Sequence, residues 1–128
     1  MAIASTLAHR RVLLVEDEYF IAVELHSALE SRGAEVVGPA ATVKDALALV
    51  AGAGPLDGAV LDINLRGEMA YPVADALLTR GIPFVFTTGY DEAVIPSRFT
   101  GIVRCEKPAN PVKVAEVLFA GSAGREGP

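Results

Sequence analysis

The sequence predicts an α/β domain built on a doubly wound, parallel sheet of five strands. Five short runs rich in valine, leucine and isoleucine recur along the chain, as expected for strands that are buried on both faces. Segments with apolar residues at helical spacing separate these runs, and glycine or proline stands at many of the junctions. Strands that alternate with helices pair in parallel through right-handed crossovers, so this pattern favours a doubly wound sheet.

The expected strands and helices follow one another without an internal repeat or linker. Gly33 is expected to end the first helix, and Thr42 is a candidate N-cap for the second. Pro96 leaves scarcely a turn before it in the fourth helix, which we expect to be short and prone to fray. The expected strands cover residues 11–17, 34–40, 57–65, 82–89 and 101–107. The expected helices cover residues 21–33, 42–52, 72–81, 91–99 and 110–118.

Length and composition are those of one globular domain. The chain has 128 residues, of which 52% are hydrophobic and 21% charged, so it can bury a core. We expect the domain to span residues 11–119, between a flexible leader over 1–10 and a flexible tail over 120–128. The net charge of −5 disfavours nucleic acid as a partner, because a sequence-independent grip on phosphates needs a basic surface.

The single cysteine and the distribution of apolar residues bear on location. Cys105 cannot form an internal disulfide, and no cluster of cysteine and histidine indicates zinc. No apolar run reaches the length of about 20 residues that a membrane span needs, and the first residues lack the pattern of a secretory signal. We therefore expect a protein of the cytoplasm that does not interact with membranes.

Polar residues gather where the expected strands end. In open α/β sheets, ligands bind beyond the carboxyl ends of the strands, so these residues are candidates for one site. Several carboxylates close together repel one another unless some are protonated or a cation lies among them. The polar residues expected at this edge are Glu16, Asp17, Glu18, Asp62, Asn64, Thr87, Thr88, Glu106 and Lys107.

These residue types favour phosphoryl transfer onto a carboxylate. Oxygen ligands suit Mg²⁺, which commonly binds through one or two carboxylates together with a phosphate. Asp62 is placed to act as a nucleophile that forms an aspartyl phosphate. Lys107 could pair with one phosphoryl oxygen, and a threonine hydroxyl could bind another.

Four short motifs resemble those of the receiver domain of two-component response regulators. They are LLVEDE, VLDINL, VFTTGY and EKP, in this order and each at a strand end. The resemblance extends from Arg11 to Leu118. It implies a flavodoxin-like sheet of strand order 2-1-3-4-5 and a function in phosphorylation-dependent signalling.

The resemblance also implies a metal site. Asp62 would be the phosphoacceptor and would bind Mg²⁺. Asp17 would bind the metal directly, Glu16 would bind it through water, and the backbone carbonyl of Asn64 would complete the protein ligands.

Further roles follow from the same resemblance. Thr88 would be the switch hydroxyl, with Thr87 as the alternative if the register differs by one residue. Lys107 would pair with the phosphoryl group, and we expect a cis peptide bond between Lys107 and Pro108.

The fourth strand resembles a subgroup of receivers that carries a Phe-Ala-Thr-Gly-Tyr type of motif, with Thr87 in place of the alanine. This subgroup is rich in receivers that stand alone without an output domain, and we expect this chain to be one. Arg104 stands where receivers have an aromatic switch residue, so Tyr90 and Arg104 are our switch candidates. We also expect phosphorylation to order residues 91–100.

The resemblance names the kinds of partner. A histidine kinase or a histidine phosphotransfer protein would donate the phosphoryl group, and an unidentified downstream protein would bind the modified form. Homodimerisation stays open. Arg66 and Glu68 lie in the loop after Asp62 and are interpreted as solvated residues that flank the site and could tune its rates.

Three other readings stay open beside the receiver. A phosphatase with a transient phospho-Asp62 would need an acid two residues further on, where Asn64 stands. A flavodoxin-like cofactor carrier would offer hydroxyls and glycine to phosphate after the first strand, where this chain has acids. A receiver-like binding module that is never phosphorylated is disfavoured by the intact set of acids, threonine and lysine, but Arg104 keeps it open.

Overall fold

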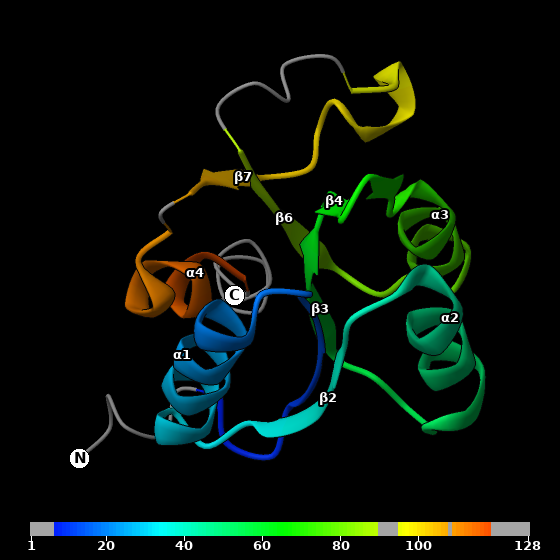
Figure 1. Cartoon of the computed structure of the whole chain (residues 1–128). Helices are drawn as coiled ribbons and strands as arrows, with labels where there is room; N and C mark the ends of the chain where they lie inside the picture. Colours follow the sequence, from blue (N-terminus) through cyan, green and yellow to red (C-terminus); the bar gives the residue numbers. More distant parts are fainter. Residues whose placement is uncertain (1–6, 90–94, 108, 119–128) are drawn as a thin grey trace.

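A computed structural model describes residues 7–89, 95–107 and 109–118 of the chain (Figure 1). Five parallel strands form the main sheet in the order β2-β1-β3-β6-β7. Counted along the chain, these strands are the second, first, third, fourth and fifth of that sheet, which is the expected order. Its strands are β1 (Arg11–Val15), β2 (Glu35–Ala40), β3 (Gly58–Asp62), β6 (Phe84–Thr88) and β7 (Arg104–Glu106).

Helices cover both faces of this sheet, as a doubly wound fold requires (Figure 1). The first and last helices lie against one face, and the second and third lie against the other. For these four helices, the expected and observed boundaries differ by two or three residues at most. The helices are α1 (Tyr19–Ser31), α2 (Val43–Gly52), α3 (Tyr71–Thr79) and α4 (Pro111–Leu118).

Alternation along the strands divides the core into two layers. In β1, Leu13 and Val15 belong to the cluster packed under α2 and α3, whereas Val12 and Leu14 belong to the cluster under α1 and α4. Successive side chains of a strand point to opposite faces, so each strand supplies both layers. The continuous apolar runs in the sequence reflect this two-sided burial.

Caps and turns hold the helices at the expected places. Thr42 is confirmed as an N-cap, since its hydroxyl accepts a hydrogen bond from the backbone N–H of Asp45. After α1 the chain reverses at Gly33, whose φ of 94° lies in the left-handed region. At α4, the side chain of Asn110 accepts hydrogen bonds from the N–H groups of Val112 and Lys113.

The third expected strand, over residues 57–65, ends earlier than the sequence pattern indicates. The main sheet loses this strand after Asp62, and Asn64–Leu65 forms a separate short strand, β4. It pairs antiparallel with β5 (Glu68–Met69) through a turn at Arg66 and Gly67. The backbone N–H of Ile63 still donates a hydrogen bond to the carbonyl of Thr87 in β6. The hairpin therefore begins directly at the carboxyl edge of the main sheet.

The expected fourth helix contains a single 3₁₀ turn, η2 (Ser97–Phe99), among its described residues. Phe99 is only 1% exposed and packs its ring against Phe86 and Tyr71. Proline at position 96 and this buried aromatic residue explain why the segment forms a short anchored turn. Residues 90–94, which include the switch candidate Tyr90, lie outside the described part of the chain.

Two further expectations concern the leader and a proline bond. Leu7, in the leader expected over residues 1–10, is 3% exposed and donates its N–H to the carbonyl of Arg32, so ordered structure begins before Arg11. The bond between Lys107 and Pro108 lies outside the described residues. A cis peptide bond occurs between Gly38 and Pro39. None of the described helices combines the length and the hydropathy that a membrane span needs.

Candidate functional site

The carboxyl ends of β1, β3 and β7 bring together most of the ionisable residues expected at this edge, but Glu106 lines a separate groove beside α4. Asp62 is the last residue of β3 and is 1% exposed, and Glu16, directly after β1, is 2% exposed. Asp17 follows Glu16, and Lys107 follows β7. Parallel strands end at the same edge, which is why residues 45 positions apart in the chain meet here.

Three acids form a compact set of oxygen donors. One carboxylate oxygen from each of Glu16, Asp17 and Asp62 lies within 4.8 Å of the other two. The buried Oε1 atom of Glu16 has no hydrogen-bond partner among the described residues. An orphaned oxygen beside two further carboxylates is a donor set that fits Mg²⁺, which prefers oxygen ligands. The acids that the sequence indicated for a metal are therefore close enough to share one.

Lys107 provides the positive charge within this set. Its Nζ atom donates a hydrogen bond to Oδ2 of Asp62 at 2.7 Å. The same ammonium lies 3.6 Å from Oε2 of Glu16 and 3.8 Å from Oε1 of Glu18. One ammonium thus faces three carboxylates, and Asp62 is its nearest partner.

Burial and mutual repulsion change the proton affinities of the two buried acids. Burial, together with the charge of Asp62, raises the pKa of Glu16 to about 8. Burial also raises the pKa of Asp62, and the hydrogen bond and charge of Lys107 oppose this rise. Burial favours the neutral form of Lys107, but its hydrogen bond to Asp62 and the nearby acids outweigh burial and raise its pKa. Without a metal, the site is therefore set up to retain a proton on Glu16 at neutral pH.

Asn64 holds the loop that follows Asp62. Its backbone N–H donates to Oδ1 of Asp62 at 3.1 Å, and its side-chain oxygen accepts from the N–H of Gly67 at 2.6 Å. Asn64 also lines an open cleft of about 360 Å³ together with Asp17, Asp62 and Lys107. A small anionic group with its hydration has room there.

Arg66 contacts the site more directly than the sequence suggested. Its side chain is 79% exposed, as expected for a solvated residue that flanks the site, and its Nε atom also donates to Oδ2 of Asp17 at 3.2 Å. The sequence feature that could have indicated this contact is a cationic residue, Arg66, four positions after Asp62. Only the fold of the β4–β5 hairpin turns it back toward Asp17.

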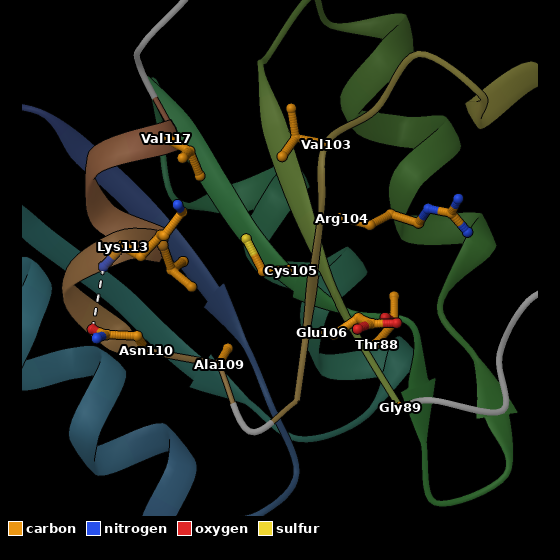
Figure 2. Close-up of a pocket in the computed structure, with 11 residues that line it drawn as sticks. Thr88, Gly89, Val103, Arg104, Cys105, Glu106, Ala109, Asn110, Lys113 and Val117 are labelled. Atoms are coloured by element: carbon orange, nitrogen blue, oxygen red, sulfur yellow. Dashed lines mark hydrogen bonds between the residues drawn. The ribbon is translucent and has the colours of Figure 1, made fainter.

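The two threonines at the end of β6 occupy different surroundings. Thr87 pairs with Asp62 across the sheet, and its buried hydroxyl has no hydrogen-bond partner among the described residues. Thr88 is also buried, and it lines a groove between β7 and α4 instead of the acidic cleft (Figure 2). The switch role expected for Thr88 stays a prediction. It requires the hydroxyl of Thr88 to move from the groove toward the acidic cleft.

The groove beside Thr88 has a volume of about 650 Å³. Figure 2 shows Cys105 and Arg104 on opposite sides of β7, with Cys105 on the side of α4. Burial raises the pKa of the Cys105 thiol, with a smaller opposing effect from Lys113, so a reactive thiolate is disfavoured. Arg104 replaces the aromatic switch residue on an exposed edge strand, and its role stays a prediction.

Solved structures share this fold and identify its class. A scan against protein-family models gave no match, and neither did a search of curated proteins. A CheY-like response regulator receiver domain protein from Methanospirillum hungatei JF-1 is 28% identical, with a TM-score of 0.76, and the match covers 93% of this chain and 98% of the other. The response regulator PhyR from Brucella abortus is 29% identical, with a TM-score of 0.70. The match to PhyR covers 92% of this chain and 51% of that protein, so the chain spans about half its length.

The chain belongs to the response regulator receiver family of two-component signalling. Within that class it is similar to SdrG from Sphingomonas melonis Fr1, at 44% identity and a TM-score of 0.76. That match covers 88% of this chain and 95% of SdrG. A second SdrG structure, described as a BeF3-activated conformation, is 40% identical, with a TM-score of 0.67, over 91% of this chain and 95% of that one.

Proposed function

We propose that the chain receives a phosphoryl group on Asp62 from a phosphohistidine donor and signals by changing which protein it binds. The donor is a histidine kinase or a histidine phosphotransfer protein. The observation that carries this proposal is the 2.7 Å hydrogen bond from Lys107 to Asp62 inside a cluster of three carboxylates. A buried carboxylate that is paired with an ammonium and open to a cleft is a plausible nucleophile.

The residues divide the work of the transfer. A carboxylate oxygen of Asp62 attacks phosphorus, the P–N bond breaks, and the imidazole nitrogen of the donor keeps the electron pair. Lys107 favours the ionised form of Asp62 before the attack and can then pair with a phosphoryl oxygen. Mg²⁺, held by Glu16, Asp17, Asp62 and the backbone carbonyl of Asn64, would neutralise charge on the transferring group.

Two comparisons with other site types support this reading. A phosphatase that uses Asp62 would need a proton donor near the leaving group, yet the residue two positions further on is Asn64, whose amide is not an acid. A carrier of a phosphate-containing cofactor would need donors where this cleft offers Asp17 and Glu18. Both arrangements favour a protein that is itself phosphorylated on Asp62 over a phosphatase or a cofactor carrier.

Relatives support the signalling role. SdrG adopts a BeF3-activated conformation, and beryllofluoride mimics a phosphoryl group on a carboxylate. Phosphorylation would add a charge of roughly −1.5 to −2 at the edge where β1, β3 and β6 end. The modified form then favours a different partner, an unidentified downstream protein, through a population shift.

Incubation with acetyl phosphate and Mg²⁺, followed by intact mass measurement, tests the proposal. The wild type is expected to gain one phosphoryl group, and Asp62→Ala is expected to gain none. Asp75→Ala is the matched control, because it removes an exposed carboxylate that pairs with Arg98 on the surface, away from the site. A wild type that gains no phosphoryl mass would favour a receiver-like binding module instead.

A further inference from the structure

Arg66 occupies an unusual backbone position beside the candidate metal site. It lies at the tip of the β4–β5 hairpin, with a φ of 56°, and Gly67 follows with a φ of 92°. A two-residue hairpin turn with both central residues in the left-handed region normally carries asparagine, aspartate or glycine at the first position. A long side chain with a branched head is uncommon there, so the turn itself does not explain the arginine.

The side chain of Arg66 reaches back to Asp17. Its Nε atom lies 3.2 Å from Oδ2 of Asp17, and a second guanidinium nitrogen lies 3.5 Å from the Asp17 main-chain carbonyl. The side chain of Arg66 is 79% exposed, whereas that of Asp17 is only 8% exposed. The guanidinium therefore contacts a largely buried carboxylate from the solvent side.

Arg66 and Lys107 divide the acids of the site between them. Lys107 forms ion pairs with Glu16, Glu18 and Asp62, and Arg66 forms one with Asp17. Asp17 also supplies one of the three clustered oxygens that could hold a divalent ion. A metal bound there and the guanidinium would therefore both draw on the carboxylate of Asp17.

We propose that Arg66 is a built-in competitor for the divalent cation: it pairs with Asp17 when no metal is bound and is displaced when Mg²⁺ binds. Arg66 thereby sets the Mg²⁺ concentration at which the site becomes competent. This inference rests on the metal site of the proposed function.

The exposure of Arg66 determines how strong this competition is. A guanidinium that is mostly in solvent can rotate away without disturbing the core, and exposed ion pairs are weak. The competition is therefore modest and reversible. Removing Arg66 is expected to lower the dissociation constant for Mg²⁺ about 1.4- to fivefold, the range that follows from the usual strength of such pairs.

Titration with Mg²⁺ alone, followed by amide NMR shifts of Asp17 and Asp62, tests the competition without any phosphodonor. Arg66→Asn removes the cation and keeps a residue that tolerates the left-handed turn, so the hairpin should fold. Arg98→Ala removes the same charge from an ion pair with Asp75 elsewhere on the surface. Arg66→Lys keeps a cation at the turn.

The expected result is tighter Mg²⁺ binding in Arg66→Asn, an unchanged affinity in Arg98→Ala, and an affinity nearer to the wild type in Arg66→Lys. Equal affinities in the wild type and Arg66→Asn would overturn the inference and leave the metal site standing. Equal gains in Arg66→Asn and Arg98→Ala would also overturn it, because the effect would then reflect net charge alone. If neither the wild type nor Arg66→Asn responds to Mg²⁺, the metal site of the proposed function fails, and the inference fails with it.

Discussion

Two buried carboxylates, Glu16 and Asp62, face one ammonium at the end of the sheet, and this imbalance shapes the behaviour of single residues. Lys107 pairs most closely with Asp62, so Glu16 keeps an oxygen without a partner. Structure alone would favour fewer acids here, because buried carboxylates of like charge repel one another. We interpret the excess of buried carboxylates over ammonium groups as a requirement of a site that binds a cation, because functional sites are commonly less stable than they could be.

The raised pKa of Glu16 predicts a pH dependence of stability in the absence of metal. A glutamate in the unfolded chain has a pKa of 4.5, whereas that of Glu16 in the folded protein is about 8. Folding therefore favours the protonated form of Glu16. This contribution is fully present below pH 4.5 and is lost as the pH rises through 8. With a chelator present, the unfolding free energy should fall by an amount on the order of a few kcal/mol between pH 5 and pH 9, and the melting temperature should fall with it.

Glu16→Gln is the variant that isolates this effect, because it removes the titrating group and keeps its shape. The difference in stability between the variant and the wild type should grow as the pH rises from 5 to 9. A difference that stays constant with pH would mean that Glu16 titrates normally.

The hydroxyl of Thr87 is buried without a partner among the described residues. Thr87→Val replaces it with a methyl group of similar size, so we expect a variant that is equally stable or more stable by about 1 kcal/mol. Urea denaturation measures this. Thr42→Val is the matched control, and it should lose about 1 kcal/mol because the hydroxyl of Thr42 caps α2. A comparable loss in both variants would show that the Thr87 hydroxyl is hydrogen bonded after all.

At the scale of elements, irregular backbone positions direct the chain around the site. The pairing of β1 with β2 shifts register between Leu13 and Val15. Gly38, in the opposite strand, has a φ of 102°. Beyond this irregularity, the carbonyl of Ala40 accepts a hydrogen bond from the N–H of Glu16. The irregular strand therefore helps to place the first acid of the site.

Gly38→Ala should destabilise the protein strongly. A Cβ atom at this position would lie 2.7 Å from the carbonyl oxygen of Leu14 and 2.9 Å from the backbone nitrogen of Ala40. Backbone strain and this clash together should cost about 2 kcal/mol or more. Gly52→Ala is the control, since a Cβ there meets nothing within 4 Å and alanine should be tolerated at the last residue of α2. Thermal melting measures both variants. Similar melting temperatures for Gly38→Ala and Gly52→Ala would show that the backbone of Gly38 does not require glycine.

The η2 segment links the edge of the sheet to α3. Phe99 anchors it in the core, and Arg98 forms two hydrogen bonds with Asp75 of α3. We predict that phosphorylation protects residues 91–100 against amide exchange, with the largest gain before this anchor. Exchange measured with and without beryllofluoride tests the prediction. Identical protection over 91–100 in both states would contradict it.

At the scale of the whole molecule, the sheet separates two core layers. The layer under α2 and α3 contains Phe84, Phe86 and Phe99, whereas the layer under α1 and α4 is built from aliphatic residues. The candidate site lies at one end of the sheet, where both layers stop. A ligand bound there would contact residues at the carboxyl ends of β1, β3 and β7, so its binding energy should stabilise the fold as a unit.

Mg²⁺ should therefore raise the melting temperature of the whole protein. At a concentration ten times the dissociation constant, the gain is about 1.4 kcal/mol if only the native state binds, which corresponds to a shift of several degrees. Asp17→Asn should abolish most of this shift. A shift of equal size in that variant would show that Mg²⁺ acts elsewhere.

Much of the fold could be predicted because its signals are local. Apolar runs such as 58–61 indicate strands buried on both faces, and the hydroxyl of Thr42 indicates where α2 begins. The end of the third strand could not be predicted in the same way. Leu65 continues the apolar pattern, and only the pairing of β4 with β5 shows that it has left the main sheet.

The sequence by itself determined the strand–helix alternation and the set of residues at the carboxyl edge of the sheet, because periodicity and strand ends are properties of neighbouring residues. The strand order followed only from the resemblance to receiver domains, and the structure has that order. Only the tertiary structure decided which of those residues meet. It paired Lys107 with Asp62, turned Arg66 onto Asp17, and left Thr88 beside the groove and not in the acidic cleft. These contacts join residues far apart in the chain, and they depend on strand register and a hairpin turn that no local pattern encodes.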